Sequence, residues 1–294
     1  MDGVRHFLDA ESLSRLRALQ VRSRYAVEGA SAGGHRSRRK GLSVEFADYR
    51  QYVPGDDLKR IDWRVFGKNE RLYLRQSEEE TCLQVQLFVD KSASMGYGSG
   101  KMTKYRYASI LAAAIAYAAI RRQDAAGLAL FDESCRSYLP PKSGPEHLRI
   151  LCNLLHEGES GKGTALAGSL HTLAERVRRR GLVVVFSDLL DDVDAVSGAL
   201  SHFRRRGHDV VVYQVLDRAE LEFPFRETAC FVDMESGEKV FATPREIRDG
   251  YRRELEAFRL RCHRMCTQLG AEYHLVPTDG DAVETLLRHW GNRG

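Results

Sequence analysis

The sequence lacks paired cysteines and long hydrophobic runs, and each absence argues against a class of protein. Its six cysteines are scattered and form no Cys-x-x-Cys pair, which argues against a zinc site and favours free thiols in a reducing compartment. The longest apolar run, residues 110–120, is too short to span a bilayer. The first twenty residues are charged and show no signal peptide. We therefore expect a cytoplasmic protein with no transmembrane segment.

A strong excess of charge is also missing. The net charge is +4 over 294 residues, which does not by itself indicate a nucleic-acid partner. One short glycine-rich segment is nevertheless basic at Arg36 and residues 38–40, as expected of either an anion-facing surface or a solvated loop. Nucleic-acid binding through this N-terminal segment therefore stays open as an alternative. It would involve further basic residues nearby, namely Arg50, Lys59, Arg60 and Arg64.

One stretch organises the rest of the chain. Residues 83–89 are a short apolar run with two interleaved glutamines, typical of a strand in the core of a sheet. Asp90, Ser92 and Ser94 follow at alternate positions where that strand ends. Ligands collect at the carboxyl end of a central strand in an open parallel sheet. Three oxygen-bearing side chains can converge there on a hard cation such as magnesium.

Two more oxygen donors stand at predicted loop positions. Thr164 follows a glycine-rich turn just before a helical pattern, and Asp188 ends a second apolar strand, residues 182–187. Together with Asp-x-Ser-x-Ser, these residues resemble the ligand set of a metal-ion-dependent adhesion site in a von Willebrand factor A domain. The resemblance implies that the hydroxyls of Ser92, Ser94 and Thr164 bind the cation. It also implies that Asp90 and Asp188 bind it directly or through water.

A second resemblance lies upstream, in residues 45–63. Their pattern is Glu-Phe-x-x-x-Arg-x-Tyr-x-Pro-Gly-Asp-Asp-x-x-x-Ile-Asp-Trp, which is similar to the signature of the domain of unknown function 58 family. In that family the signature precedes a von Willebrand A-like domain, as it does here, and the likeness covers roughly residues 30–220. The resemblance implies a partner as well, because such proteins are often encoded beside AAA+ ATPases of the MoxR type.

From residue 83 onward, predicted strands alternate with predicted helices, which indicates a mainly parallel sheet covered on both faces. We therefore expect an α/β fold of the von Willebrand A type over residues 81–294, with an inserted β-hairpin near residues 228–242. Residues 1–80 are expected to form a smaller N-terminal region that carries the family signature.

The function expected from these patterns is that of a non-enzymatic adaptor. It would dock an aspartate or glutamate of a partner protein through a divalent cation, most naturally Mg²⁺, although Mn²⁺ and Ca²⁺ also favour oxygen ligands. The partner would be a MoxR-type AAA+ ATPase, in a chaperone-like or assembly role. The enzymatic alternative is a magnesium-dependent phosphatase-like hydrolase of the haloacid dehalogenase type. That chemistry needs a second aspartate two residues after the nucleophile, and Ser92 occupies this position.

Overall fold

A computed structural model of the protein describes Val4, Phe66, Gly161, Gly163 and these ranges: 6–23, 46–52, 72–77, 82–158 and 165–291. The chain divides into two compact units, one of Arg22–Cys82 and a larger one of Met1–Val21 with Leu83–Gly294. The division differs from the expected boundary at residues 80 and 81, because residues 1–21 belong to the larger unit. Leu8, Leu16 and Leu19 are buried in that unit's core.

The larger unit is built on a six-stranded sheet in the order β10-β7-β6-β3-β4-β5. All neighbouring pairs are parallel except β4 and β5. The edge strand β5 contains Pro140 and Pro141, which suits an antiparallel edge. The strands are β3 (Gln84–Asp90), β4 (Ala125–Phe131), β5 (Cys135–Lys142), β6 (Leu182–Ser187), β7 (Asp209–Leu216) and β10 (Glu272–Pro277). The predicted α/β class with a mainly parallel sheet is confirmed.

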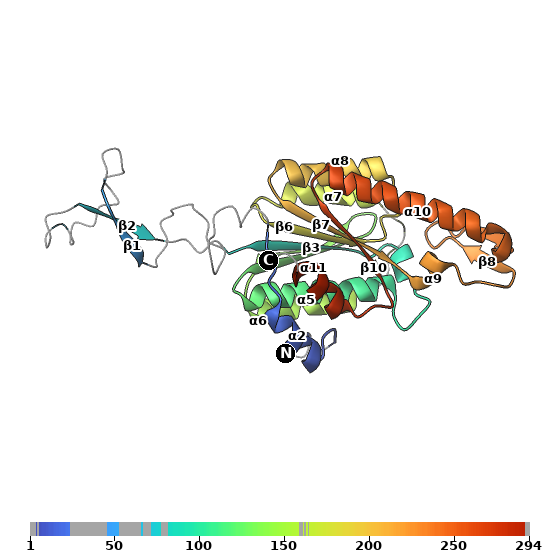
Figure 1. The fold of residues 1–294 in the computed structure, drawn as a ribbon, viewed down its shortest axis with the longest axis horizontal. Coiled ribbons are helices and arrows are strands. Elements are labelled where there is room, and N and C mark those ends of the chain that lie inside the picture. Colours follow the sequence, from blue (N-terminus) through green and yellow to red (C-terminus); the bar gives the residue numbers. More distant parts are fainter. Residues whose placement is uncertain are drawn as a thin grey trace. The chain divides into compact units, whose positions relative to one another are not determined.

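Helices cover both faces of this sheet (Figure 1). One face carries α5 (Lys104–Arg121), α6 (Pro145–Glu157) and α11 (Ala282–Gly291), and the other carries α7 (Leu166–Arg176), α8 (Val193–Arg205) and α10 (Pro244–Gln268). Each face has its own buried hydrophobic cluster. The strands between them are therefore buried on both sides, which explains their nearly continuous apolar sequences.

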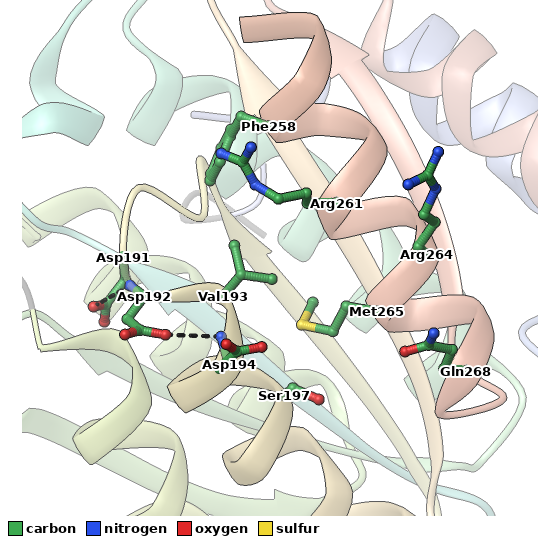
Figure 2. A pocket seen from close by; sticks show the side chains of 10 residues that line it. All are labelled: Asp191, Asp192, Val193, Asp194, Ser197, Phe258, Arg261, Arg264, Met265 and Gln268. Atoms are coloured by element: carbon green, nitrogen blue, oxygen red, sulfur yellow. Dashed lines mark hydrogen bonds between the residues drawn. The ribbon is translucent and has the colours of Figure 1, made fainter. Parts of the chain in front are cut away.

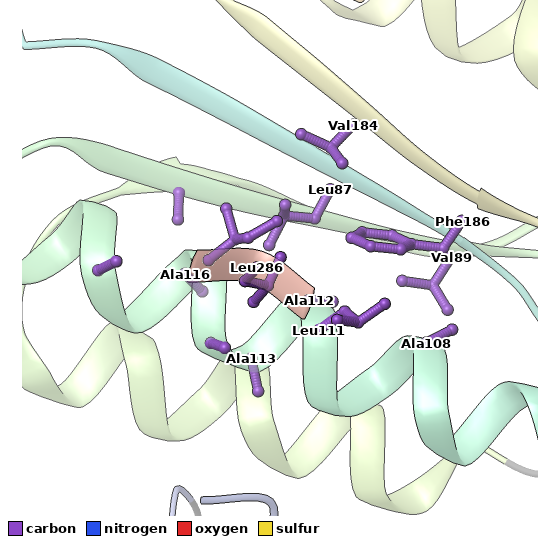
Figure 3. Close-up of a cluster of buried hydrophobic side chains, with 14 of the residues drawn as sticks. Leu87, Val89, Ala108, Leu111, Ala112, Ala113, Ala116, Val184, Phe186 and Leu286 are labelled. Carbon is purple, nitrogen blue, oxygen red and sulfur yellow. The ribbon is translucent and has the colours of Figure 1, made fainter. Parts of the chain in front are cut away.

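Helix α5 is the most deeply buried helix of the first face. It begins at the cap residue Thr103, whose Oγ1 accepts a hydrogen bond from the backbone N–H of Arg106 at 3.1 Å. Some of its alanines face the sheet, where Ala108 and Ala112 are close to Val89 of β3 and Phe186 of β6 (Figure 3). Small side chains let the helix axis approach the strands closely, so the first residues of α5 lie near the carboxyl ends of β3 and β6.

Smaller elements of the larger unit lie beyond β7 and at the N-terminus. Helix α9 (Arg218–Glu222) follows β7, and β8 (Ala229–Val232) pairs antiparallel with β9 (Lys239–Ala242) in the expected hairpin. At the N-terminus, α2 (Ala10–Arg15) leads into a 3-10 turn. None of the helices in the described parts of the chain is long and apolar enough to cross a membrane.

The smaller unit contains one antiparallel pair, β1 (Phe46–Gln51) with β2 (Tyr73–Ser77), and a register shift lies between Phe46 and Asp48. Most of the predicted family signature and the basic segment at residues 36–40 lie outside the described residues. The same holds for Lys59, Arg60 and Arg64.

Candidate metal centre

The turn after β3 brings together the three side chains of the Asp-x-Ser-x-Ser motif. Asp90 is the last residue of β3, and its Oδ1 accepts a hydrogen bond from the backbone N–H of Ser92 at 2.8 Å. This bond folds the chain back, so that the Oγ atoms of Ser92 and Ser94 lie 3.2 Å apart. Asp90 and Ser92 are buried. The motif therefore forms a compact cluster of oxygen atoms at the carboxyl end of the central strand.

The end of β6 supplies the second half of the cluster. Ser187 Oγ donates a 2.6 Å hydrogen bond to Asp90 Oδ2, which ties β6 to the neighbouring strand β3. Asp188 follows, and its Oδ1 accepts the backbone N–H of Leu190 at 3.2 Å. Leu189 lies between them with a φ of 62°, a left-handed conformation that costs a non-glycine residue of order 1 kcal/mol. The local fold thus holds Asp188 at the site in a strained turn.

A buried glutamine fixes the backbone at this point. Gln214 of β7 donates from Nε2 to the carbonyl oxygen of Asp188 at 2.9 Å, and its own Oε1 accepts the Tyr273 hydroxyl at 2.5 Å. Gln214 is wholly buried, so this amide has exchanged water for a defined pair of partners. The position of Asp188 is therefore set by three adjacent strands.

The pKa of Asp90 reflects its burial and the negative charge of Asp188. Burial raises the pKa of Asp90, the negative charge of Asp188 raises it further, and hydrogen bonds from Ser187 and Ser92 offset only part of the rise. The resulting pKa is about 7. Two carboxylates that share a buried site disfavour each other's charged form. A divalent cation bound beside them would reverse this effect.

One cation of the chain already reaches the cluster. Lys104, the first residue of α5, donates from Nζ to Asp188 Oδ2 at 2.8 Å and to Glu220 Oε1 at 2.7 Å. Its side chain is 0% exposed and that of Asp188 is 2% exposed. Burial alone would lower the pKa of Lys104, but the two carboxylates raise it above its ordinary value. The ammonium is therefore a permanent positive charge at the edge of the site.

Thr164, the remaining predicted ligand, lies outside the described residues, and its role stays a prediction. The described residues on either side of it are anchored beside the cluster. Gly161 donates its backbone N–H to the carbonyl oxygen of Lys91 at 2.5 Å. The backbone N–H of Ala167 donates to Asp191 Oδ2 at 3.2 Å. A Cβ atom at Gly161 would lie 2.3 Å from Asp132 Oδ2, so this close approach requires glycine.

The donor atoms fit a hard divalent cation. Asp90, Ser92, Ser94 and Asp188 offer carboxylate and hydroxyl oxygens, which Mg²⁺ and Ca²⁺ prefer to nitrogen or sulfur. Among the described residues, no group of three or more His, Cys, Asp or Glu side chains could hold a metal ion. A cation at this edge would therefore depend on the serine hydroxyls for its coordination.

A pocket of about 460 Å³ lies between the start of α8 and the C-terminal half of α10 (Figure 2). Aspartates line one side of it and the arginines Arg261 and Arg264 line the other. Two of the aspartates have structural roles. Asp191 accepts the Ala167 N–H, and Asp192 caps α8 by accepting backbone N–H groups of its first turn. None of the four predicted metal ligands that the structure describes lines this pocket.

Four residues of the site were not predicted: Lys104, Ser187, Gln214 and Glu220. Two of them carried a readable signal. A lysine at the first position of a helix opposes the helix dipole, which indicates a role other than helix stability. Asp217 and Glu220 have the spacing of a capping box, which the structure contains at the start of α9. Ser187 and Gln214 have no comparable local signal, because their roles arise only from the pairing of strands.

The model of one protein family, described as "Protein of unknown function DUF58", matches residues 48–261 of this chain. The chain belongs to the DUF58 family. Uncharacterized proteins of Mycobacterium tuberculosis and Mycobacterium bovis are each 27% identical to it over 289 residues, which is 97% of this chain and 90% of theirs. The family suggested by the Pro-Gly-Asp-Asp signature is therefore confirmed.

Among solved structures, this DUF58 protein is similar to an aerotolerance-related membrane protein from Bacteroides fragilis. The identity is 15% and the TM-score 0.51, with 72% of this chain and 100% of that chain covered. A looser match is to the SpRpn10 VWA domain, with 10% identity, a TM-score of 0.40 and coverage of 71% and 95%. At identities this low, the comparison supports a similar fold only, and the metal ligands remain a prediction.

Proposed function

We propose that this DUF58 protein is a non-enzymatic adaptor that docks an acidic side chain of a partner protein through a divalent cation, most naturally Mg²⁺. Five residues would hold the cation: Asp90, Ser92, Ser94, Thr164 and Asp188. When bound, the cation supplies an open coordination position that water fills and an incoming aspartate or glutamate takes over. The proposed partner is a MoxR-type AAA+ ATPase, as the family resemblance implies.

One observation carries this proposal. Asp90 and Asp188 follow one another across adjacent strands at the carboxyl edge of the sheet, where Ser187 hydrogen-bonds to Asp90, and burial together with the charge of Asp188 raises the pKa of Asp90 to about 7. Buried like charges are costly unless a cation compensates them. The serine hydroxyls beside them add neutral ligands, which would leave part of a divalent charge uncompensated. That remaining charge is what would attract a partner's carboxylate.

The roles of the described side chains also support an adaptor over a hydrolase. A nucleophilic carboxylate of this kind needs a nearby general acid. The position where a phosphatase of this type has that acid is Ser92, whose hydroxyl lies against Ser94.

The proposal is tested by binding between the full chain and a purified MoxR-type AAA+ ATPase of the same organism, with a native lysate and mass spectrometry as the wider search. We expect the wild type to retain its partner in Mg²⁺ and to lose it in EDTA. Asp90→Ala should lose the partner in both buffers while keeping its circular dichroism spectrum.

A matched control keeps this test specific. Asp194 is an exposed acid at the start of α8, and Asp194→Ala should bind the partner as the wild type does. A partner retained by Asp90→Ala and in EDTA would contradict the proposal and shift attention to the N-terminal basic segment. Unfolding of Asp90→Ala would instead make that aspartate structural.

A further inference from the structure

Lys104 stands where a lysine is expected to be unfavourable. It is the first residue of α5, where the positive end of the helix dipole repels a cation, and its side chain is 0% exposed. A buried ammonium needs close anionic partners, and Lys104 has two, Asp188 and Glu220. Its position therefore depends on the carboxylates of the candidate metal centre and not on the helix that carries it.

The ammonium uses an oxygen atom that a metal would need. Asp188 Oδ2 accepts from Lys104 Nζ, and Asp188 Oδ1 accepts the Leu190 N–H. Both carboxylate oxygens are thus engaged. A cation that takes Asp188 as a ligand must share an oxygen with one of these donors or displace it. The lysine side chain ends in a flexible four-carbon stem, so it can move more readily than a backbone N–H.

Glu220 offers the displaced ammonium a fixed alternative. Its Oε2 accepts the backbone N–H of Asp217 at 2.7 Å in the capping box of α9, while its Oε1 faces Lys104. The capping box anchors the glutamate whether or not Asp188 is engaged. Lys104 can therefore give up Asp188 and still keep one buried carboxylate as its partner.

We propose that Lys104 is a built-in competitor of the divalent cation for Asp188, and that Glu220 retains its ammonium when the cation binds. This inference rests on the metal site of the proposed function and adds a residue that controls how tightly the site binds its cation. Lys104 sets the affinity of the site for a free cation below what its oxygen ligands alone would give. With Asp188 engaged by a cation, Lys104 would be held by Glu220 alone, which would couple the metal centre to α9.

The test measures metal binding alone, by titrating the full chain with Mn²⁺ and following free Mn²⁺ by electron paramagnetic resonance. Lys104→Met keeps the length of the side chain without its charge, and we expect it to bind Mn²⁺ at least about tenfold more tightly. Glu220→Gln removes one partner of the ammonium and commits it to Asp188, so Mn²⁺ binding should weaken by about threefold or more. Lys101 is exposed in the preceding loop, and Lys101→Met should match the wild type within about twofold.

A variant with both Lys104→Met and Glu220→Gln distinguishes two explanations for an effect of Glu220: competition through Lys104, or the attraction of its negative charge for the cation. If Glu220 acts through Lys104, Glu220→Gln should change Mn²⁺ affinity by less than about twofold in the Lys104→Met background. An equal effect in both backgrounds would overturn the inference, because Glu220 would then act only as a distant charge. Equal affinity of Lys104→Met and wild type would overturn it as well.

The two proposals fail in different ways. If the wild type and all variants bind no Mn²⁺, the metal site itself is wrong and both proposals fall. If the wild type binds Mn²⁺, Asp90→Ala does not, and Lys104→Met matches the wild type, only the role of Lys104 is wrong. Binding by Lys104→Met alone would support competition by Lys104 but overturn the proposed function, because the wild-type protein would then hold no cation.

Discussion

Buried carboxylates lie at both ends of the six-stranded sheet, in different surroundings. At the amino end, Asp124 precedes β4 and its Oδ1 accepts the backbone N–H of Leu83 at 2.9 Å. Asp209 begins β7 there and lies 3.4 Å from Arg204. At the carboxyl end, Asp90 and Asp188 crowd each other, and Lys104 is shared between Asp188 and Glu220.

The difference separates a structural acid from a functional one. At the amino end, Asp124 accepts a backbone N–H at a strand terminus and Asp209 pairs with Arg204, so each acid has a fixed partner. At the carboxyl end, two acids, Asp188 and Glu220, share the Lys104 ammonium, and the pKa of Asp90 rises to about 7. Burial of a carboxylate is therefore no sign of function by itself. Uncompensated negative charge at the edge where ligands collect is such a sign.

The largest expected effect on stability comes from removing the acid Asp124 at the amino end of the sheet. Asp124→Ala leaves the Leu83 N–H without its carboxylate acceptor, which should lower the free energy of unfolding by up to about 3 kcal/mol. Mn²⁺ affinity should stay unchanged. Urea denaturation and the Mn²⁺ titration measure the two quantities. Asp124→Asn keeps an acceptor oxygen at the same place and should recover most of the stability.

The same measurement on Asp90→Ala sharpens the comparison. Removing this acid relieves the repulsion with Asp188 and loses two hydrogen bonds, so the free energy of unfolding without metal should change by less than about 1 kcal/mol. Stabilisation by Mg²⁺ should disappear. A loss as large as that of Asp124→Ala would place Asp90 among the structural acids and remove the contrast between the two ends.

A pair of stacked histidines should make stability depend on pH in a way that the acids at the two ends of the sheet do not explain. His274 of β10 and His289 of α11 stack with their ring centroids 4.0 Å apart. Burial lowers the pKa of His274 from 6.5 to about 4, and burial together with the neighbouring His274 and Arg288 lowers the pKa of His289 to about 4. Glu272 lies 3.6 Å from His274 Nε2, too far for a hydrogen bond, so burial prevails.

The sign of the pH dependence follows from these lowered values. The unfolded chain binds protons near pH 6.5 and the folded chain only near pH 4, so stability is fully present above pH 6.5 and falls as the pH drops through this window. Because the rings are partly exposed, we expect about 1 kcal/mol for each histidine between pH 7 and pH 5. His274→Phe with His289→Phe should flatten the curve in urea denaturation. An unchanged slope would assign the acid sensitivity to the carboxylates.

Much of the fold could be predicted because its signals are local. The apolar run of β3 with its Asp-x-Ser-x-Ser turn, the alanine-rich α5 and the prolines of β5 each specify an element by composition and period. The turn also places Asp90, Ser92 and Ser94 together, because a spacing of two residues brings side chains to one side of a short turn.

Contacts between distant elements could not be predicted in this way. Lys104 and Asp188 are 84 positions apart, and they meet only because the small residues of α5 bring the start of this helix to the end of β6. Glu220 lies in a five-residue helix, too short to give a periodic pattern. The contacts of Lys104 with Asp188 and Glu220 thus arise from the packing of distant elements, which a short sequence motif does not contain.

Asp132 lies at the carboxyl end of the sheet but resembles the acids at the amino end. Its substitution should have the smallest effect on the candidate metal centre. It follows β4 at the carboxyl end and is buried, yet Arg136 Nε donates to both of its oxygens, at 2.7 and 3.0 Å. Its charge is therefore compensated by an arginine, as that of Asp209 is at the amino end. Asp132→Asn should therefore cost about 1 kcal/mol of stability and change Mn²⁺ affinity by less than about twofold. A change above about fivefold would extend the metal site to β4 and make position in the sheet, not compensation of charge, the feature that marks a functional acid.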